Sequence, residues 1–330
     1  MNDKPNSKPP PDWWRDTVDC WHRLPNKAFF FVLLAAWLAL FQFLGNPILG
    51  YVHTPSLFSW MIGAYNSPDS DDGHGNFIPF LVIGLFWWKR RELLAQPLNL
   101  WWPSLLILAA ALMLHVAGYA VQQPYLCIAA LFAGIYGLMG LAWGRAWLRN
   151  SLFPFFLFIF SVPLGQRAEF ITFPLRQLVS WLSEKVAHVL GIGVIREGTQ
   201  LFDPSGSFGF DVAAPCSGMR SLIAVFLLAT IYGFFTFRSP WKRLFLIALA
   251  LPFAVLGNLA RMLCIIVAAE IGGQPWGNYV HEGCPIHVPL VSDVFGDIAI
   301  VSLVPYLPAM VGLLLVGRWL ENRELKKASA

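Results

Sequence analysis

The residues best suited to chemistry in this 330-residue chain are a cysteine and an arginine at the start of an apolar run, 210-FDVAAPCSGMRSLIAVFLLATIYG-233. Cys216 directly follows Pro215, and Arg220 lies four residues further on. If a helix begins here, its partially positive N-terminal end and the Arg220 cation on the same face both favour the thiolate form of Cys216. A thiolate is a competent nucleophile. A free cysteine is equally often an inert packing residue, so both interpretations of Cys216 stay open.

A second arginine lies inside another apolar run, 251-LPFAVLGNLARMLCIIVAAE-270. A charged side chain costs about 3 kcal/mol at the centre of a bilayer, and Arg261 therefore marks a functional site by default. Asn258 and Cys264 lie three residues to either side, on the same helical face. We expect Arg261 and Asn258 to face the interior of a helix bundle. The alternative is that Arg261 reaches a lipid phosphate at the membrane surface.

Two of the seven histidines, His281 and His287, follow in the polar segment 272–296. Either histidine could act as the base that a cysteine nucleophile needs. A cysteine, an arginine and a histidine near one membrane face indicate acyl transfer on a peptide. In such a site the thiolate attacks a carbonyl, the histidine moves the proton and Arg261 stabilises the oxyanion.

The composition places these residues in a membrane protein. Hydrophobic residues make up 57% of the chain and charged residues 13%, with a mean hydropathy of +0.58. Soluble domains are about half apolar and about a quarter charged. A spanning helix needs roughly 20 mostly apolar residues. We predict an all-α polytopic membrane protein with about eight transmembrane helices, near 28–47, 76–88, 103–121, 125–143, 150–165, 217–235, 244–271 and 297–317.

The lysines and arginines indicate the orientation of these helices. If the N-terminus is inside, seventeen of the 23 lie in inner segments, which is the bias expected of cytoplasmic loops. We therefore expect a cytoplasmic tail at 1–27, a single transmembrane domain at 28–317 and a second cytoplasmic tail at 318–330. The net charge of +4 reflects this topology. No basic face is visible, and we expect no nucleic-acid partner.

Two features of the outer segment 166–216 are expected to be structured. Apolar residues recur at helical spacing in 175–191, which predicts an amphipathic helix along the outer membrane surface. Two short strand-like runs flank Asp203-Pro204-Ser205-Gly206, which predicts a β-hairpin. The preceding outer segment, 48–75, is predicted to be a polar loop. The five cysteines are scattered without metal-ligand spacing, so we expect no metal and no cofactor.

Four runs of residues give the chain a family resemblance. The run 213-AAPCSGMRSL-222 resembles the nucleophile motif A-x-x-C-S-G-x-R-x-L of the exosortase/archaeosortase family. The runs 258-NLARML-263 and 278-NYVHE-282 are similar to the arginine and histidine elements that follow it, and 74-HGNFIPFLVIGLFWWKRR-91 is similar to an early segment. The resemblance covers roughly residues 55–317.

The resemblance implies a cysteine transpeptidase of the cytoplasmic (inner) membrane with its active site on the periplasmic, outer face. Such enzymes cleave C-terminal sorting signals (PEP-CTERM-like) of exported proteins and pass the new C-terminus to an acceptor, which here is unknown. The implied partners are these exported proteins and the lipid bilayer. The implied roles are nucleophile for Cys216, oxyanion stabiliser for Arg261, acid/base for His281, and support for Ser217, Gly218, Arg220 and Asn258.

The chain departs from the family pattern at two points. The family's histidine commonly leads into G-[WY]-x-x-F, which His281 does not, whereas His287 has Phe295 eight residues later. We favour His281 because of its spacing from Arg261, and His287 is the alternative. The early motif has Gly73 where a serine is usual. The alternative function is a polytopic transporter or flippase for an envelope or exopolysaccharide precursor, which explains the buried Arg261 but leaves the Cys216 motif unexplained.

Overall fold

The computed structural model describes residues 13–48, 50, 52–67, 70–164, 169–211, 219–282, 284–286, 298–299 and 306–328. The chain divides into two compact units. Unit 1 comprises Met1–Ala64 and Gly75–Val162, and unit 2 comprises Tyr65–His74 and Pro163–Ala330. Each unit has its own packed helices, which are described separately below.

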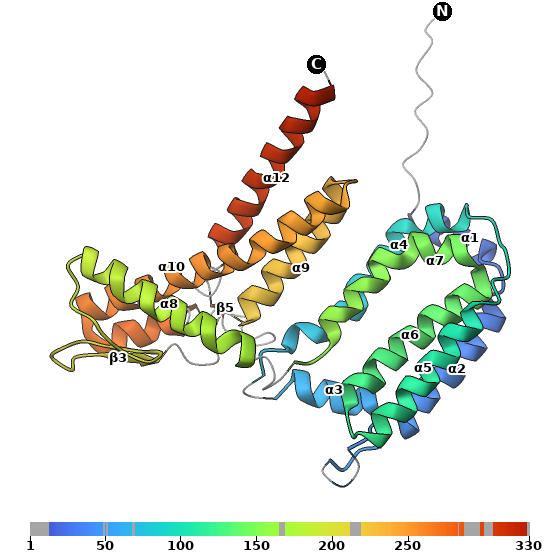
Figure 1. Ribbon diagram of the computed structural model, residues 1–330, viewed down its shortest axis with the longest axis horizontal. Helices are drawn as coiled ribbons and strands as arrows, with labels where there is room; N and C mark the ends of the chain where they lie inside the picture. The colour runs from blue at the N-terminus through green and yellow to red at the C-terminus, as the bar shows by residue number, and fades with distance from the viewer. Residues whose placement is uncertain are drawn as a thin grey trace, which may run out of the picture. The chain divides into compact units, whose positions relative to one another are not determined.

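Unit 1 is a helical bundle built around one apolar helix. Its elements are α1 (Trp13–Arg23), α2 (Lys27–Leu44), α3 (Leu57–Tyr65), α4 (Ile78–Leu94), α5 (Ser104–Ala120), α6 (Pro124–Trp143), α7 (Arg145–Phe156) and the 3-10 helix η2 (Leu157–Ser161), with η1 (Gly73–Asn76) at the boundary between the units. Helices α2 and α5 both pack against α6, and α4 packs against α7 (Figure 1). Gly134 allows the close approach of α2, since a Cβ there would lie 1.9 Å from the Trp37 ring. The indole of Trp37 donates a hydrogen bond to Leu131 O at 3.0 Å.

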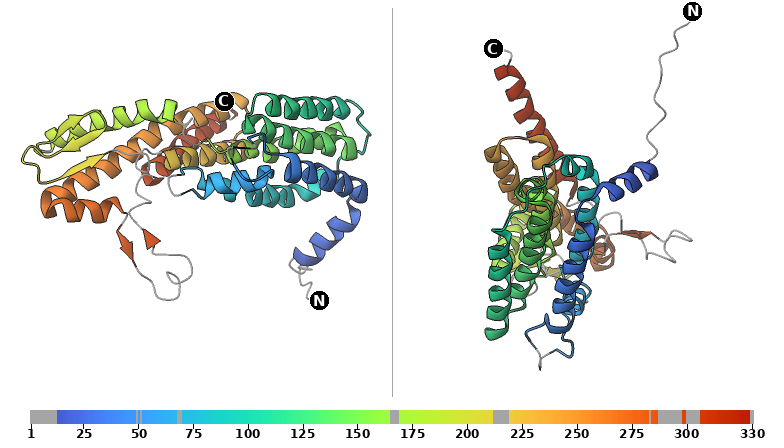
Figure 2. Two further views of the ribbon diagram at one scale, coloured as in Figure 1. Left: turned by 90° about the horizontal axis from the view of Figure 1, so that it is seen from below. Right: turned by 90° about the vertical axis from the view of Figure 1, so that its right-hand side faces the viewer.

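Unit 2 is organised along its longest helix. Its elements are α8 (Glu169–Val189), β1 (Ile195–Glu197), β2 (Gln200–Phe202), β3 (Gly209–Asp211), α9 (Met219–Thr236), α10 (Pro240–His281), β4 (Pro285–Ile286), β5 (Ile298–Ala299) and α12 (Tyr306–Ala328). The first half of α10 packs with α9 and α12 through a core that includes Val225, Leu246, Ala250 and Leu313. The second half packs with α8 and the three-stranded antiparallel sheet β1-β2-β3 (Figure 2).

Helix α10 turns back on itself at Gly273. This glycine has φ 72° and ψ −172°, a backbone conformation outside the helical region that L side chains rarely adopt. Beyond it the chain runs back along the helix, since a Cβ on Gly277 would lie 2.9 Å from the Cβ of Ala269. At 1.5 Å per residue the part before the turn, 240–272, is about 50 Å long, which exceeds the roughly 30 Å thickness of the hydrocarbon core of a bilayer. The reversal at Gly273 brings residues 274–281 back alongside the residues that precede the turn.

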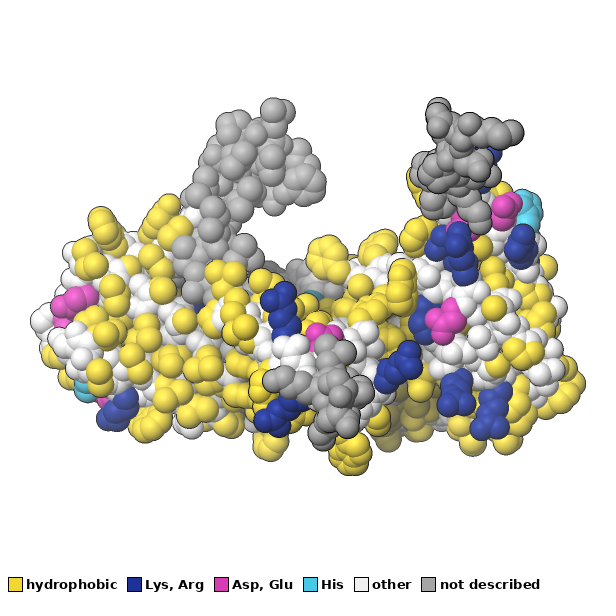
Figure 3. Space-filling view, turned by 90° about the horizontal axis from the view of Figure 1, so that it is seen from above, with side chains coloured by type: hydrophobic (Ala, Val, Ile, Leu, Met, Phe, Trp, Pro, Cys, Tyr) yellow, Lys and Arg dark blue, Asp and Glu magenta, His cyan; other side chains and the backbone are white. Residues whose placement is uncertain are grey.

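Three described helices are long and apolar enough to cross a membrane: Lys27–Leu44, Pro124–Trp143 and Pro240–His281. Ser104–Ala120 and Leu222–Thr236 are shorter apolar helices. Large hydrophobic side chains are exposed on both units, among them Phe80, Leu106, Trp241 and Ile271. Figure 3 shows hydrophobic side chains over much of the face that it draws. The prediction of a mostly helical, multi-pass membrane protein is confirmed, and the number of eight crossings remains a prediction.

Several predicted boundaries differ from the structure. The interval 13–23, placed in a hydrophilic tail, is helix α1, and the loop 48–75 contains α3. Both helices are too short to give a hydropathy signal over a 20-residue window. The outer segment expected from residue 272 begins as helix, and α8 begins at Glu169, six residues before the expected start. Of the predicted eighth crossing, Ile298–Ala299 forms β5, and α12 begins at Tyr306 and continues to Ala328.

The predicted hairpin is confirmed, and it carries a third strand. Strands β2 and β3 pair on either side of Asp203-Pro204-Ser205-Gly206, and β1 pairs with the other edge of β2. The Asp203 carboxylate accepts hydrogen bonds from the backbone N–H groups of Ser205 and Ser207, both at 3.2 Å. Hydrogen bonds from these two serines hold the pKa of Asp203 below its ordinary value. Gly206 supplies the positive φ of 77° that the turn requires.

Helix α1 is held to α4 by one carboxylate between two guanidinium groups. Asp16 is hydrogen-bonded to Arg90 and, at 2.7 Å, to Arg91 Nη2. The guanidinium of Arg90 also lies 4.0 Å from the centroid of the Trp87 ring. Hydrogen bonds from Arg91 and then Arg90 lower the pKa of Asp16 from its ordinary value. The bridge therefore stabilises the docked helix above the ordinary aspartate pKa and is lost as the pH falls through the lowered value.

We predict that α1 stays docked between pH 7 and pH 5 because Asp16 remains ionised throughout that range. Asp16→Asn should raise amide hydrogen exchange in 13–23 at both pH values, after correction for intrinsic exchange rates, as measured by mass spectrometry. Asp19→Asn, on the same helix, is the matched control and should exchange like the parent protein. Equal protection in Asp16→Asn and the parent would contradict this role for the carboxylate.

Candidate active site

The centre of the candidate site is a contact between Arg261 and the backbone of His281. The Nη2 of Arg261 donates a hydrogen bond to His281 O at 3.0 Å, across twenty residues of the same helix. In a straight helix these residues would lie about 30 Å apart. The turn at Gly273 therefore brings the cation and the imidazole-bearing residue to the same place.

A glutamine side chain attaches the folded-back segment to the sheet. Gln274 Oε1 accepts a hydrogen bond from Gly209 N at 2.8 Å, and Gln274 Nε2 donates to Gly209 O at 3.3 Å. The same Nε2 donates to Asn278 Oδ1 at 2.8 Å. The amide thus pairs with the edge of β3 as another strand would, and fixes that strand beside residues 274–281.

The aromatic ring of Phe210 on β3 lies against the site histidine. Its centroid is 6.5 Å from that of the His281 ring, with the planes 20° apart. The approach requires glycine at position 277, because a Cβ there would lie 2.3 Å from Phe210 Cζ. Beneath this contact lies a buried core of Val179, Ala187, Leu201, Phe210, Met262, Ile265, Ile266 and Ala269 from α8, the sheet and α10. The arginine and the histidine are therefore carried on a packed, rigid base.

The polar groups around Arg261 differ in their exposure. Asn258 is buried, whereas Cys264, which was expected on the same face, is exposed. The two lie six residues apart on α10, far enough for them to diverge around the helix. The Nε of Arg261 is buried and has no hydrogen-bond partner among the described residues. One N–H of the guanidinium therefore has no acceptor in the part of the chain that the structure describes.

The structure places some of the predicted site residues and leaves others outside its described part. Arg261 and His281 are brought together, and Asn258 lies one helical turn before Arg261. The backbone of Arg220 is in the first turn of α9, and its side chain is not described. Cys216, Ser217, Gly218 and His287 lie outside the described residues.

Sequence reasoning missed four residues that build the site: Phe210, Gly273, Gln274 and Gly277. The signal for the turn was present in 272-GGQP-275, because paired glycines followed by proline mark a break in a helix. This signal predicts the end of the helix, and it does not predict the second helical stretch that returns along the first. The pairing of Gln274 with β3 has no local pattern that would reveal it.

The early family-like segment has its own anchoring contact. The carboxylate of Asp72 is buried and accepts a hydrogen bond from Leu164 N at 3.0 Å. Beside it, His74 Nδ1 lies 3.3 Å from Asp71 O. A Cβ on Gly73 would meet only Tyr65 O, at 3.7 Å, which is an ordinary contact. The fold therefore has room for a serine side chain at this position.

The apolar spanning helices and the exposed hydrophobic side chains define a multi-pass α-helical membrane protein. Comparison with protein families identifies which one: the family described as transmembrane exosortase matches residues 60–292. This chain belongs to the transmembrane exosortase family, as its motifs predicted. No curated protein and no solved structure matches the chain. The matched range includes Cys216, Arg261 and both candidate histidines.

We predict that Gly277→Ala destabilises unit 2, because the added methyl group overlaps Phe210 and Ala269. Such overpacking typically costs about 1–3 kcal/mol, which should appear as a lower midpoint of thermal unfolding in detergent. Gly84→Ala in α4 is the control, since a Cβ there meets nothing within 4 Å. A Gly277→Ala protein that unfolds at the same temperature as Gly84→Ala would contradict the close packing of residues 274–281 on the sheet.

Proposed function

We propose that this protein is a cysteine transpeptidase that cleaves the C-terminal sorting signal of exported proteins and transfers the new C-terminus to an acceptor. Membership of the exosortase family establishes a membrane transpeptidase-type role in general terms. We propose in addition that it recognises a sorting signal, cleaves it by thiol chemistry and transfers the product to an acceptor. The single observation that carries it is the hydrogen bond from Arg261 to His281 O, which joins two of the three residues that the chemistry needs.

In the first step the thiolate of Cys216 attacks the carbonyl carbon of the scissile peptide bond. A carbon–sulfur bond forms, and the carbonyl π electrons move to oxygen, giving a tetrahedral oxyanion. Arg261 donates a hydrogen bond to this oxygen; its Nε, which has no partner among the described residues, fills this role while Nη2 holds His281 O. A fixed cationic donor of this kind stabilises the oxyanion more than it stabilises the substrate carbonyl.

In the second step the carbon–nitrogen bond breaks, and the His281 imidazolium gives its proton to the leaving amine. A sorting signal of the kind that the family resemblance implies consists of a short motif, a spanning helix and a basic tail. The released fragment carries the helix and the tail, and the exported protein remains as a thioester on Cys216. The acceptor (water, an amine or a lipid) then attacks the thioester and loses its proton to His281. The thiolate leaves, and the enzyme returns to its starting state.

Chain length supports the inclusion of Cys216 in this site. Cys216 follows Phe210, whose ring lies against that of His281, by six positions in the chain. Six extended residues span at most about 21 Å, so the nucleophile is tethered within that reach of the Phe210 backbone. Ser217, Gly218 and Arg220 follow it directly and, with Asn258, are proposed to support the nucleophile and the oxyanion site.

The proposed setting is the cytoplasmic (inner) membrane, with residues 28–317 as one transmembrane domain and the tails 1–27 and 318–330 in the cytoplasm. Helix α10 supports this orientation. Arg238, Lys242 and Arg243 lie at its start, where cytoplasmic cations are expected. Arg261 and His281 lie well over a bilayer half-thickness further along it, on the side proposed to be periplasmic.

We predict that Cys216→Ala and Arg261→Gln both abolish or strongly reduce loss of the C-terminal tail from a co-expressed PEP-CTERM-type substrate. The expected loss for Arg261→Gln is about 10²–10³-fold in rate, as for removal of an oxyanion donor. Tail loss is followed by gel shift and mass spectrometry. Cys264→Ala and Arg238→Gln, both at exposed positions, are the matched controls and should process substrate normally.

The same assay distinguishes the two histidines and the rival function. His281→Ala should stop processing and His287→Ala should not, because the backbone of His281 is hydrogen-bonded to Arg261 and His281 has the favoured spacing from it. The reverse result would move the acid/base role to His287. Normal processing by Cys216→Ala would exclude thiol chemistry at that residue, and a transporter or flippase would then be the better description.

A further inference from the structure

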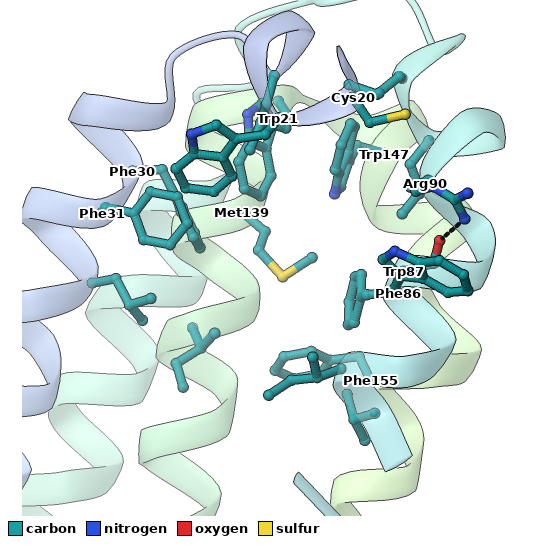
Figure 4. A pocket seen from close by; sticks show the side chains of 18 of the residues that line it. Cys20, Trp21, Phe30, Phe31, Phe86, Trp87, Arg90, Met139, Trp147 and Phe155 are labelled. Carbon is teal, nitrogen blue, oxygen red and sulfur yellow. Dashed lines mark hydrogen bonds between the residues drawn. The ribbon is translucent and has the colours of Figure 1, made fainter. Parts of the chain in front are cut away.

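Unit 1 contains a cavity that the proposed chemistry does not use. Its volume is about 560 Å³, within the range of small-molecule sites. It lies among α1, α2, α4, α6 and α7 with η2, and aromatic side chains dominate its wall (Figure 4). The labelled residues of that view include Phe31, Phe86, Met139, Trp147 and Phe155, which surround the open space. Water would find few polar partners there, so the occupant must be largely hydrocarbon.

A second, polar hollow adjoins this cavity. It has a volume of about 460 Å³ and shares Cys20 and Leu94 with the apolar cavity. Its charged lining residues are Asp16, Asp19, Arg23 and Arg91. An apolar space continued by a charged space is complementary to an amphiphile, with a chain in one part and a charged headgroup in the other.

One polar atom in the wall of the apolar cavity indicates which group the bound molecule must carry. The indole of Trp147 is 5% exposed, and its Nε1 has no hydrogen-bond partner among the described residues. Buried indole N–H groups usually find an acceptor. In Figure 4 this nitrogen points into the open space. The occupant should therefore present an acceptor oxygen at the edge of its hydrocarbon part, as the ester carbonyl of an acyl chain does.

A peptide helix fits the cavity less well than a lipid does. A helix about 10 Å wide would fill 560 Å³ with only about 7 Å of its length. The basic tail of a sorting signal would gain no net attraction there, because Asp16 and Asp19 balance Arg23 and Arg91 in the lining of the polar hollow. A phosphate in the polar hollow would be attracted chiefly to Arg23, because Arg91 is already paired with Asp16.

We propose that unit 1 binds one glycerophospholipid of the membrane in these joined hollows. One acyl chain occupies the cavity between α2 and α4, its ester carbonyl accepts a hydrogen bond from Trp147 Nε1, and its phosphate lies beside Arg23 and Arg91. Helix α1 closes the site, because Thr17, Cys20 and Trp21 line the apolar cavity and Asp16 lines the polar one. This proposal is independent of the peptidase chemistry in unit 2.

The test is native mass spectrometry of the full chain purified in mild detergent, with the bound lipid identified after release. The parent protein should retain about one phospholipid per chain. Met139→Trp fills the cavity and should reduce occupancy at least tenfold, whereas Met113→Trp, at a position 67% exposed on α5, should leave it unchanged. Trp147→Phe keeps a ring but removes the N–H, and should weaken retention about fivefold, as loss of one hydrogen bond predicts.

Three results would overturn the proposal. One is a parent protein that carries no lipid, and another is a bound molecule without phosphate, such as a fatty acid or a peptide. The third is equal occupancy in Met139→Trp and Met113→Trp, which would mean that the lipid is only part of the surrounding annulus. If Met139→Trp does not fold, the comparison rests on Trp147→Phe, and unchanged retention in that variant overturns the proposal as well.

Discussion

A guanidinium within an apolar helix needs an acceptor, and in this protein the acceptor is the backbone carbonyl of His281. That requirement explains the surrounding structure. The carbonyl comes within reach only because α10 reverses at Gly273, and the reversal packs tightly only because Gly277 has no side chain. Gln274 then fastens the returning segment to β3. One turn, one small residue and one side-chain amide thus together provide the acceptor for a half-buried charge.

The same contact connects the fold of unit 2 to its chemistry. The sheet directs the chain from Phe210 towards the segment that carries Cys216, and the returning end of α10 presents His281 beside Phe210. Both elements rest on the core that α8 shares with α10. Unit 1 is built differently. Its helices line an apolar cavity, and the bridge from Asp16 to Arg90 and Arg91 holds α1 against α4 beside it.

The features that could be predicted from the sequence are those whose physical requirements produce a local pattern of residues. Long apolar runs predicted α2, α5, α6 and most of α10 because a bilayer demands them, and Arg261 was identified because a charge in such a run is expensive. The hairpin followed from the turn at Asp203. The missing parts depend on long-range geometry. The partner of Arg261 is a backbone carbonyl, which every residue has, so no residue type identifies it. The side chain of Gln274 hydrogen-bonds to β3 as a neighbouring strand would, and no periodic pattern in the sequence predicts this. Short helices such as α1 and α3 contain too few residues for a hydropathy window to detect.

The most direct test of the central claim is to trap the covalent intermediate that the geometry around Arg261 and His281 is proposed to serve. The enzyme would be mixed with a sorting-signal peptide, quenched in acid and digested, and the active-site peptide analysed by mass spectrometry. The proposed mechanism predicts a hydroxylamine-sensitive acyl adduct on Cys216 that carries the N-terminal part of the substrate. Cleavage of the peptide without such an adduct, or an adduct on Cys264 or Cys284 instead, would contradict it.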